Sequence, residues 1–231
     1  MKVLGLDTST SCGSVGLVKN GEVISEYILN VPATHSQRIL AAIELVLQES
    51  CCPIEQIDTW SIALGPGSFT GLRIGVSTIK GLAFATGKPV TGVSTLDVLA
   101  SQISPAPYLI CPLLDARKQE VYAAFYRFEK NTMNRLSDYQ AIKPEDLVKS
   151  IKEQTIFVGE GAKNYREFLL KSLSSLALFP PAPFHLAHGS VVAKLGFELL
   201  EKGESLDLST FAPIYVRPSE AEIKWQEKYS A

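Results

Sequence analysis

Apolar positions recur with two different periods along this chain, and each period predicts one kind of element. Short apolar or alternating runs predict strands at residues 2–7, 13–19, 22–30, 59–64 and 89–93. Asn20-Gly21, between the second and third runs, is a strong hairpin signal because both residues tolerate the backbone of a tight turn. Apolar residues three and four apart predict helices from about Thr34, from Ser68 to Thr86 and from Ser94. The first hundred residues therefore alternate strands and helices, as α/β proteins do.

The opening pattern returns in the second half of the chain. Strands are predicted at 108–115, 120–128 and 155–159, and helices at 164–174 and 190–202. Residues 2–7 and 108–115 both form an apolar run that ends in aspartate, followed by a turn and a returning strand. This repeat predicts a duplicated α/β unit. Because the segment Ser104-Pro105-Ala106-Pro107 is rich in turn residues, the predicted domains are residues 1–104 and 105–231.

A Gly-Pro-Gly turn at residues 65–67 joins a predicted buried strand to the helix that starts at Ser68. Ser68 is well placed to cap that helix. Such a turn brings a helix N-terminus either to a phosphate or to another segment of chain. A P-loop also needs a lysine next to its last glycine, and the nearest cation here is Arg73. The sequence therefore favours close packing over phosphate binding.

The helix after this turn carries two stripes of residues at helical spacing. One stripe is apolar and comprises Phe69, Leu72, Val76, Ile79 and Ala83. The other is mostly small and comprises Gly71, Gly75, Thr78 and Leu82. Glycine inside a helix costs about 1 kcal/mol relative to alanine, so Gly71, Gly75 and Gly81 indicate close approach by another group. That group is either part of the same chain or a second subunit. The preceding helix, residues 39–47, is too apolar for one buried face, which favours an interface shared by the two helices.

Composition narrows the function classes. A net charge of −2 over 231 residues gives no overall attraction to nucleic acid. No apolar run reaches membrane-spanning length, and the N-terminus does not resemble a secretion signal. The four cysteines include no C-x-x-C pair, so we expect reduced structural thiols in a cytoplasmic protein. The three histidines, His35, His185 and His188, do not form a convincing ligand set, so no metal site is predicted.

Several segments carry a family resemblance that runs over nearly the whole chain. They are residues 5–10 with 14–16, 35–40, 65–75, 92–96, 115–122 and 213–217. In these segments the chain resembles the TsaB family, also called YeaZ, of the actin/sugar-kinase/Hsp70-like superfamily. The resemblance implies an α/β fold of two duplicated actin-like (RNase H-like) lobes, the second reduced.

The resemblance also implies a function and partners. TsaB-like chains are non-catalytic dimerisation subunits that bind TsaD, with the ATPase TsaE, for threonylcarbamoyl transfer to adenosine 37 of tRNAs reading ANN codons. They also form homodimers. ATP and Mg²⁺ are used by the complex rather than bound by this chain alone, and tRNA is contacted through the complex only. The implied partner surface comprises His35, Arg38, Leu45, Phe69, Gly71, Arg73, Gly75, Thr78 and Leu82.

The same resemblance argues against an independent enzyme. TsaD-like proteins bind a metal through a His-x-x-x-His pair, and the corresponding positions here are Thr95 and Leu99. An alternative is a stand-alone Mg-ATP-dependent kinase or ATPase of the superfamily, whose nucleotide and metal would be held by Asp7, Thr8, Ser9 and Asp115. These residues are equally typical of strand-ending turns whose side chains bond their own backbone.

Overall fold

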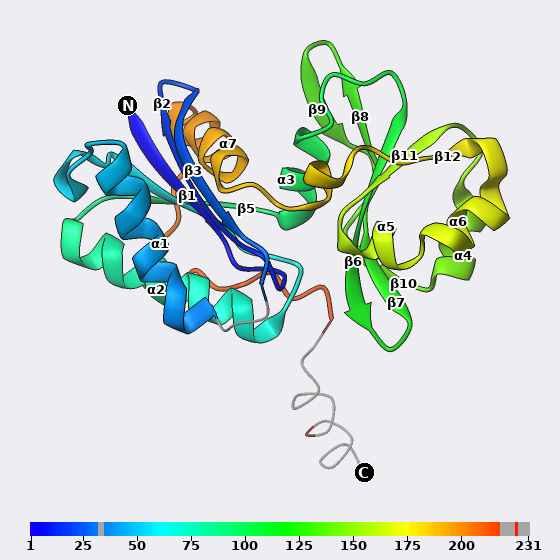
Figure 1. The fold of residues 1–231 in the computed structure, drawn as a ribbon, viewed down its shortest axis with the longest axis horizontal. Coiled ribbons are helices and arrows are strands. Elements are labelled where there is room, and N and C mark those ends of the chain that lie inside the picture. The colour runs from blue at the N-terminus through cyan, green and yellow to red at the C-terminus, as the bar shows by residue number, and fades with distance from the viewer. Residues whose placement is uncertain (32–34, 218–224, 226–231) are drawn as a thin grey trace.

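The computed structural model describes residues 1–31, 35–217 and 225. The first lobe is built on a five-stranded sheet in the order β3-β2-β1-β4-β5 (Figure 1). Its strands are β1 (Lys2–Asp7), β2 (Gly13–Lys19), β3 (Glu22–Leu29), β4 (Thr59–Ala63) and β5 (Val90–Val93). The first three are antiparallel neighbours, while β4 and β5 run parallel to β1. The predicted strands and the Asn20-Gly21 hairpin are confirmed.

Helices cover both faces of this sheet. Helices α1 (His35–Glu49) and α2 (Phe69–Thr86) pack on one face with the short helix η1 (Ile54–Gln56), and their core includes Leu4 and Leu6 of β1. Helix α7 (Gly189–Glu201) packs on the other face, as Figure 1 shows. It lies so close to β1 that a Cβ added to Gly5 would stand 2.2 Å from the Gly189 carbonyl oxygen. Leu4 and Leu6 present large side chains to α1 and α2, whereas Gly5 lets α7 approach the opposite face closely. The side chains of β1 therefore determine how far the helices on each face lie from the sheet. Thr34, where the first helix was predicted to begin, lies outside the described residues.

The second lobe repeats the strand order of the first. Its sheet runs β10-β7-β6-β11-β12, with the hairpin β8–β9 attached to β6. The strands are β6 (Leu109–Arg117), β7 (Glu120–Ala123), β8 (Tyr126–Glu129), β9 (Thr132–Arg135), β10 (Gln140–Ile142), β11 (Thr155–Val158) and β12 (Ala177–Leu178). Its helices are α4 (Pro144–Ser150), α5 (Glu160–Asn164), α6 (Arg166–Leu173), η2 (Ser174–Leu176) and η3 (Ala182–His185). The duplicated α/β fold with a smaller second lobe is confirmed, since β12 has only two residues.

The chain crosses between the lobes twice, and the second crossing changes the predicted domain boundaries. The first crossing carries α3 (Thr95–Ser101), and the second runs from η3 to α7. Because α7 packs on the first sheet and Phe211 lies in the first lobe's core, the second lobe does not extend over residues 105–231 as expected. The sequence pattern of α7 shows an apolar face but not which sheet covers it.

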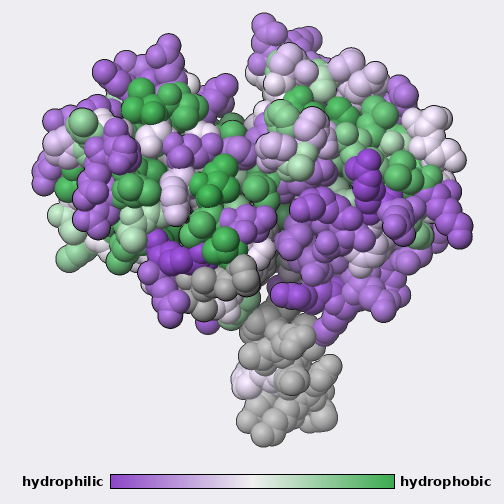
Figure 2. Space-filling view, viewed as in Figure 1, coloured by the Kyte–Doolittle hydropathy of each residue, from purple (hydrophilic) through white to green (hydrophobic). Residues whose placement is uncertain are grey.

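The surface differs between the lobes. In Figure 2 hydrophobic patches appear on both lobes, while the lower part of the second lobe is mainly hydrophilic. Among the described residues, no helix combines the length and the apolar character needed to cross a membrane. Cys12, Cys52 and Cys111 are buried free thiols and Cys51 is an exposed one, as the spacing of the cysteines predicts.

Candidate partner-binding surface and inter-lobe cleft

The Gly-Pro-Gly turn uses its polar groups within the chain. The Ser68 amide donates to the Ser9 carbonyl oxygen at 2.6 Å, and the Ser68 hydroxyl accepts from the Gly71 amide at 3.3 Å. Ser68 is therefore the predicted N-cap of α2. A Cβ at Gly67 would stand 2.3 Å from the same Ser9 oxygen. The turn packs against the end of β1 instead of presenting these amides to a phosphate.

Gly71 and Gly75 belong to the same internal contact. A Cβ at Gly71 would stand 2.1 Å from the Thr8 carbonyl oxygen, and one at Gly75 would stand 2.3 Å from Thr8 Oγ1. The Thr8 hydroxyl donates to the Gly71 carbonyl oxygen at 2.8 Å. The prediction that these two glycines form a partner surface is therefore wrong, because the group that approaches them is Thr8 of the same chain.

The two aspartates that end the repeated strands form matching turns. Asp7 Oδ1 accepts from the Ser9 amide at 3.3 Å, and Asp115 Oδ1 accepts from the Arg117 amide at 2.8 Å. Asp7 is 1% exposed, and burial raises the pKa of its carboxyl group to about 7. Its Oδ2 and the buried Ser9 hydroxyl have no hydrogen-bond partner in the part of the chain that the structure describes. The strand-ending-turn alternative thus describes the local geometry of both aspartates.

A cleft of about 650 Å³ lies between the lobes near these turns. Its lining includes Ser9, Asp115, Glu160 and Arg217, but not Asp7. Across residues 1–31, 35–217 and 225, no group of three His, Cys, Asp or Glu side chains could hold a metal ion. Of the four residues predicted to hold Mg²⁺ and nucleotide, Ser9 and Asp115 line the cleft, whereas Asp7 and Thr8 do not.

The outer side of α1 and α2 is apolar and open. A groove of about 580 Å³ runs between the two helices and is lined mainly by Leu40, Ile43, Leu47, Cys51, Cys52, Pro53, Ile54 and Leu82, with Glu44 and Gln48 at its polar part. Leu40 of α1 is 59% exposed, and Phe84 of α2, which does not line this groove, is 83% exposed. Large apolar side chains this exposed are typical of surfaces that a partner covers. We call this groove and Phe84 the α1–α2 surface.

The predicted partner-surface residues divide into three groups. Leu45, Thr78 and Leu82 lie on exposed or half-buried parts of the helices, and the Thr78 hydroxyl bonds its own helix at the Ile74 carbonyl. Gly71 and Gly75 are internal, as shown above. The remaining residues, His35, Arg38, Phe69 and Arg73, belong to the cleft end of the helices, where His35 and Phe69 line the cleft.

At that cleft end, an aromatic contact joins α2 to the C-terminal segment. Phe69 stacks on Tyr215 with ring centroids 5.3 Å apart, and the Arg73 guanidinium lies 3.9 Å from the centre of the Phe69 ring. Arg73 Nε also donates to the Tyr215 hydroxyl at 3.3 Å. His35 Nε2 lies 2.6 Å from the Thr10 carbonyl oxygen, and an Arg38 nitrogen lies 3.5 Å from the Val31 carbonyl oxygen. These contacts fix the ends of α1 and α2 against loops of the first lobe.

Sequence reasoning missed the most exposed members of the α1–α2 surface. Leu40 and Phe84 are apolar residues outside the stripes that pack on the sheet. Large apolar residues at positions expected to face solvent were the signal in the sequence that pointed to them. Gly81 was noted as a helix glycine without being assigned to the surface. No atom of the described residues lies within 4 Å of a Cβ added there.

His185 and His188 bond groups of the same chain, and the positions that correspond to the TsaD-like histidine pair lie in α3. His185 bonds backbone groups of Gly159 and Pro180, and His188 instead contacts Glu26. Thr95 and Leu99 are both fully buried in α3. The expectation that neither pair holds a metal stays a prediction, since these contacts describe only where the side chains lie.

The chain matches known proteins over most of its length. A family model described as TsaD, tRNA N6-adenosine threonylcarbamoyltransferase, matches residues 22–225. The chain is 30% identical to the tRNA threonylcarbamoyladenosine biosynthesis protein TsaB of Bacillus subtilis, over 98% of this chain and 99% of the relative. It is 29% identical to the TsaB protein of Escherichia coli, over 98% of each.

Solved structures give the same picture at the level of fold. YeaZ from Pseudomonas aeruginosa superposes with a TM-score of 0.79 at 26% identity, covering 93% of this chain and 99% of that one. The ROK hexokinase from Thermus thermophilus superposes with a TM-score of 0.52 at 13% identity, covering 88% of this chain and 100% of that one. The second likeness shows a shared fold and nothing further.

Proposed function

This chain belongs to the TsaB family of tRNA threonylcarbamoyladenosine biosynthesis proteins, and we propose that it acts there as a non-catalytic subunit. Its role is to bind a TsaD-type transferase through the α1–α2 surface and hold it in its active form. A TsaE-type ATPase completes the assembly, which works on tRNA in the cytoplasm. ATP and Mg²⁺ serve the complex, and this chain contributes surface rather than a reacting group.

The observation that carries this proposal is the exposed apolar face of α1 and α2. Leu40, Leu45 and Phe84 are large apolar side chains on two neighbouring helices, and the groove between those helices is open to solvent. Burying Phe84 alone removes an aromatic side chain from water, and aromatic anchors dominate the free energy of protein association. The same face also suits a second copy of this chain, so homodimer and heterodimer compete for it.

Gly81 gives the surface a second property. Unlike Gly71 and Gly75, it has open space among the described residues where a Cβ would lie, so no contact with them explains a glycine inside α2. A glycine there lowers helix stability by about 1 kcal/mol relative to alanine. Close approach of a partner helix to the α2 backbone accounts for that cost. We therefore place Gly81 at the centre of the interface in place of Gly75.

The test is association with the TsaD-type partner from the same organism, measured by sedimentation velocity and titration calorimetry. We expect a complex with the unmodified chain and a much weaker one with Gly81→Leu, whose side chain blocks backbone approach. Leu136→Ala changes an exposed apolar residue of the second lobe and serves as the matched control. A folded unmodified chain that does not associate would overturn the proposal. Normal association of Gly81→Leu would remove Gly81 from the interface.

The stand-alone kinase or ATPase has less support from the geometry. Asp7 does not line the cleft, and the amide of Ser68 that a phosphate would use donates to Ser9 instead. Calorimetry with Mg²⁺-ATP at millimolar concentration separates the two functions. Binding of nucleotide by this chain alone, at the cleft that Asp115 lines, would favour the enzyme.

A further inference from the structure

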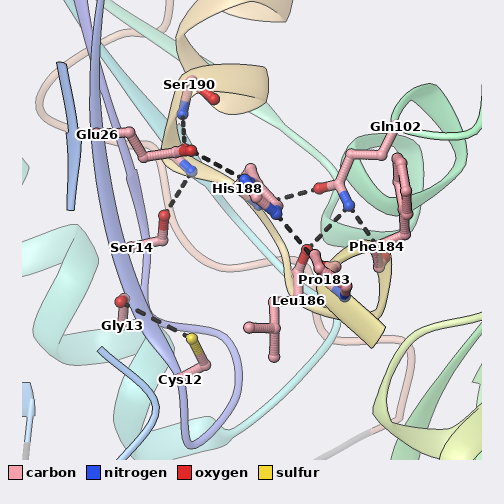
Figure 3. A network of polar contacts seen from close by, with 11 residues as sticks. Cys12, Gly13, Ser14, Glu26, Gln102, Pro183, Phe184, Leu186, His188 and Ser190 are labelled. Carbon is pink, nitrogen blue, oxygen red and sulfur yellow. Dashed lines mark hydrogen bonds and ion pairs between the residues drawn. The ribbon is translucent and has the colours of Figure 1, made fainter. Parts of the chain in front are cut away.

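The two segments that cross between the lobes are tied together by one glutamine. The Gln102 side-chain amide, at the end of α3, donates to the carbonyl oxygens of Phe184 and Leu186 at 3.0 and 2.9 Å. Its carbonyl oxygen accepts from the His188 amide at 3.0 Å. Figure 3 shows these three contacts converging on Gln102 from the second crossing. We call these two crossing segments the hinge, and the contacts of Gln102 make them behave as one unit.

A glutamate of the first lobe anchors this unit. Glu26, on β3, accepts from the Ser190 amide at 2.8 Å with Oε1, and its Oε2 lies 2.9 Å from His188 Nδ1 (Figure 3). The Gly189 amide donates to the Ser14 hydroxyl at 2.6 Å. Glu26 thus caps the N-terminus of α7 from another element, and a carboxylate there interacts favourably with the helix dipole.

Both ring nitrogens of His188 face acceptors. Nδ1 lies against the Glu26 carboxylate, and Nε2 lies 3.2 Å from the Pro183 carbonyl oxygen. A neutral imidazole carries one N–H donor, so it satisfies only one of these oxygens. The imidazolium form donates to both. The geometry therefore favours the charged ring. In that form His188 joins η3 of the second lobe to β3 of the first.

We propose that Glu26, Gln102 and His188 form a protonation-dependent clasp that holds the two lobes at a fixed angle. With His188 charged, the clasp is complete and the lobes move as one body. When the ring loses one proton, the lone pair of a ring nitrogen faces an acceptor oxygen at one of the two contacts. That contact becomes repulsive, which loosens the second crossing. The inter-lobe cleft lies between the bodies that this hinge connects, so loosening the clasp makes the cleft variable in width.

The charges around the ring agree with this geometry. The hydrogen bond to Glu26 raises the pKa of His188 above its ordinary 6.5, and partial burial acts against it. Burial alone would raise the pKa of Glu26, but the bonds from His188 and Ser190 lower it below 4.5. The other ionisable groups nearby are Cys12, whose pKa is raised to about 12 so that it stays neutral, and His185, whose pKa is lowered mainly by burial.

The sign of the pH effect follows from these directions. A histidine whose folded pKa is raised stabilises the fold below about pH 6.5, and this contribution is lost as pH rises through the higher folded value. A glutamate whose folded pKa is lowered contributes above about pH 4.5 and is lost as pH falls through the folded value. The clasp is therefore complete between the lowered pKa of Glu26 and the raised pKa of His188, and it opens on the alkaline side.

The experiment measures the distance between the lobes in the free chain. Spin labels are placed on Lys19→Cys at the end of β2 and Lys130→Cys at the β8–β9 turn, in a Cys51→Ser background that removes the exposed thiol. Electron–electron resonance should give a narrow distance distribution at pH 6 and a broader or shifted one at pH 9. His188→Gln, neutral at every pH, should give the broad distribution at both.

Two controls keep the outcome specific. Glu22→Gln changes an exposed glutamate of the same strand and should behave like the unmodified chain, whereas Glu26→Gln should behave like His188→Gln. NMR should show His188 titrating above pH 6.5, with a lower midpoint in Glu26→Gln. If Glu26→Gln fails to fold, the pH series of the unmodified chain and the His188→Gln variant still test the clasp. A distribution unchanged after His188 has titrated, or His188→Gln with the unmodified distribution, would overturn the clasp.

Discussion

Alanine at two glycines of α2 should change stability in opposite directions. A Cβ at Gly75 would stand 2.3 Å from Thr8 Oγ1 and 3.2 Å from Ile62 Cδ1, and the Thr8 hydroxyl is held by its bond to the Gly71 carbonyl. Overpacking of this kind costs about 1–3 kcal/mol, and moving Thr8 would also break a buried hydrogen bond. A Cβ added at Gly81 would meet no described atom within 4 Å, so only the helix propensity changes there, by up to about 1 kcal/mol in favour of alanine.

Urea unfolding of Gly75→Ala and Gly81→Ala, at a concentration where sedimentation shows a monomer, measures both effects. The two variants should differ in unfolding free energy by about 2–4 kcal/mol, with the unmodified chain between them. Circular dichroism and tryptophan fluorescence should report the same transition. Gly75→Ala at least as stable as the unmodified chain would refute the assignment of Gly75 to an internal contact with Thr8.

Three further changes test other parts of the structure. Phe84→Ala should weaken association with the TsaD-type partner roughly 30-fold in calorimetry, about 2 kcal/mol for an aromatic anchor, and an unchanged affinity would exclude Phe84 from the interface. Ser68→Ala should lower the unfolding free energy by about 1 kcal/mol through loss of the α2 cap, which a Ser68→Asp variant should restore. Because the pKa of Asp7 is raised to about 7, the unmodified chain should lose stability as pH rises from about 4 to about 7. Asp7→Asn should remove that loss, and a chain equally pH-dependent without Asp7 would contradict it.

The elements of the first lobe are largely predictable because their signals are local. Alternation along β1 to β3, the Asn20-Gly21 turn and the Ser68 cap each depend on residues a few positions apart. The duplication was also visible, since the apolar runs at residues 2–7 and 108–115 both end in aspartate, and each aspartate accepts a bond from the amide two residues later. Short strands such as β9, β10 and β12 carry too few residues to show a period.

The contacts that decide function are mostly non-local, and the sequence alone does not contain them. Helical spacing identified Gly71 and Gly75 as sites of close approach, but it gave no sign that Thr8, more than sixty positions earlier, approaches them. In the same way, the bond between Glu26 and His188 joins residues 162 positions apart, and neither residue stands out in its own segment. Packing against the sheets, not periodicity, determines which face of α2 stays open.

The most direct measurement of the central claim is threonylcarbamoyl transfer to tRNA in a purified system. TsaD-type and TsaE-type proteins from the same organism receive threonylcarbamoyl-AMP, ATP and tRNA, with this chain present or absent. The account predicts product only when the chain is present, none from the chain alone, and reduced product with Gly81→Leu. Transfer at the same rate without the chain would contradict it, as would transfer by the chain in the absence of the TsaD-type protein.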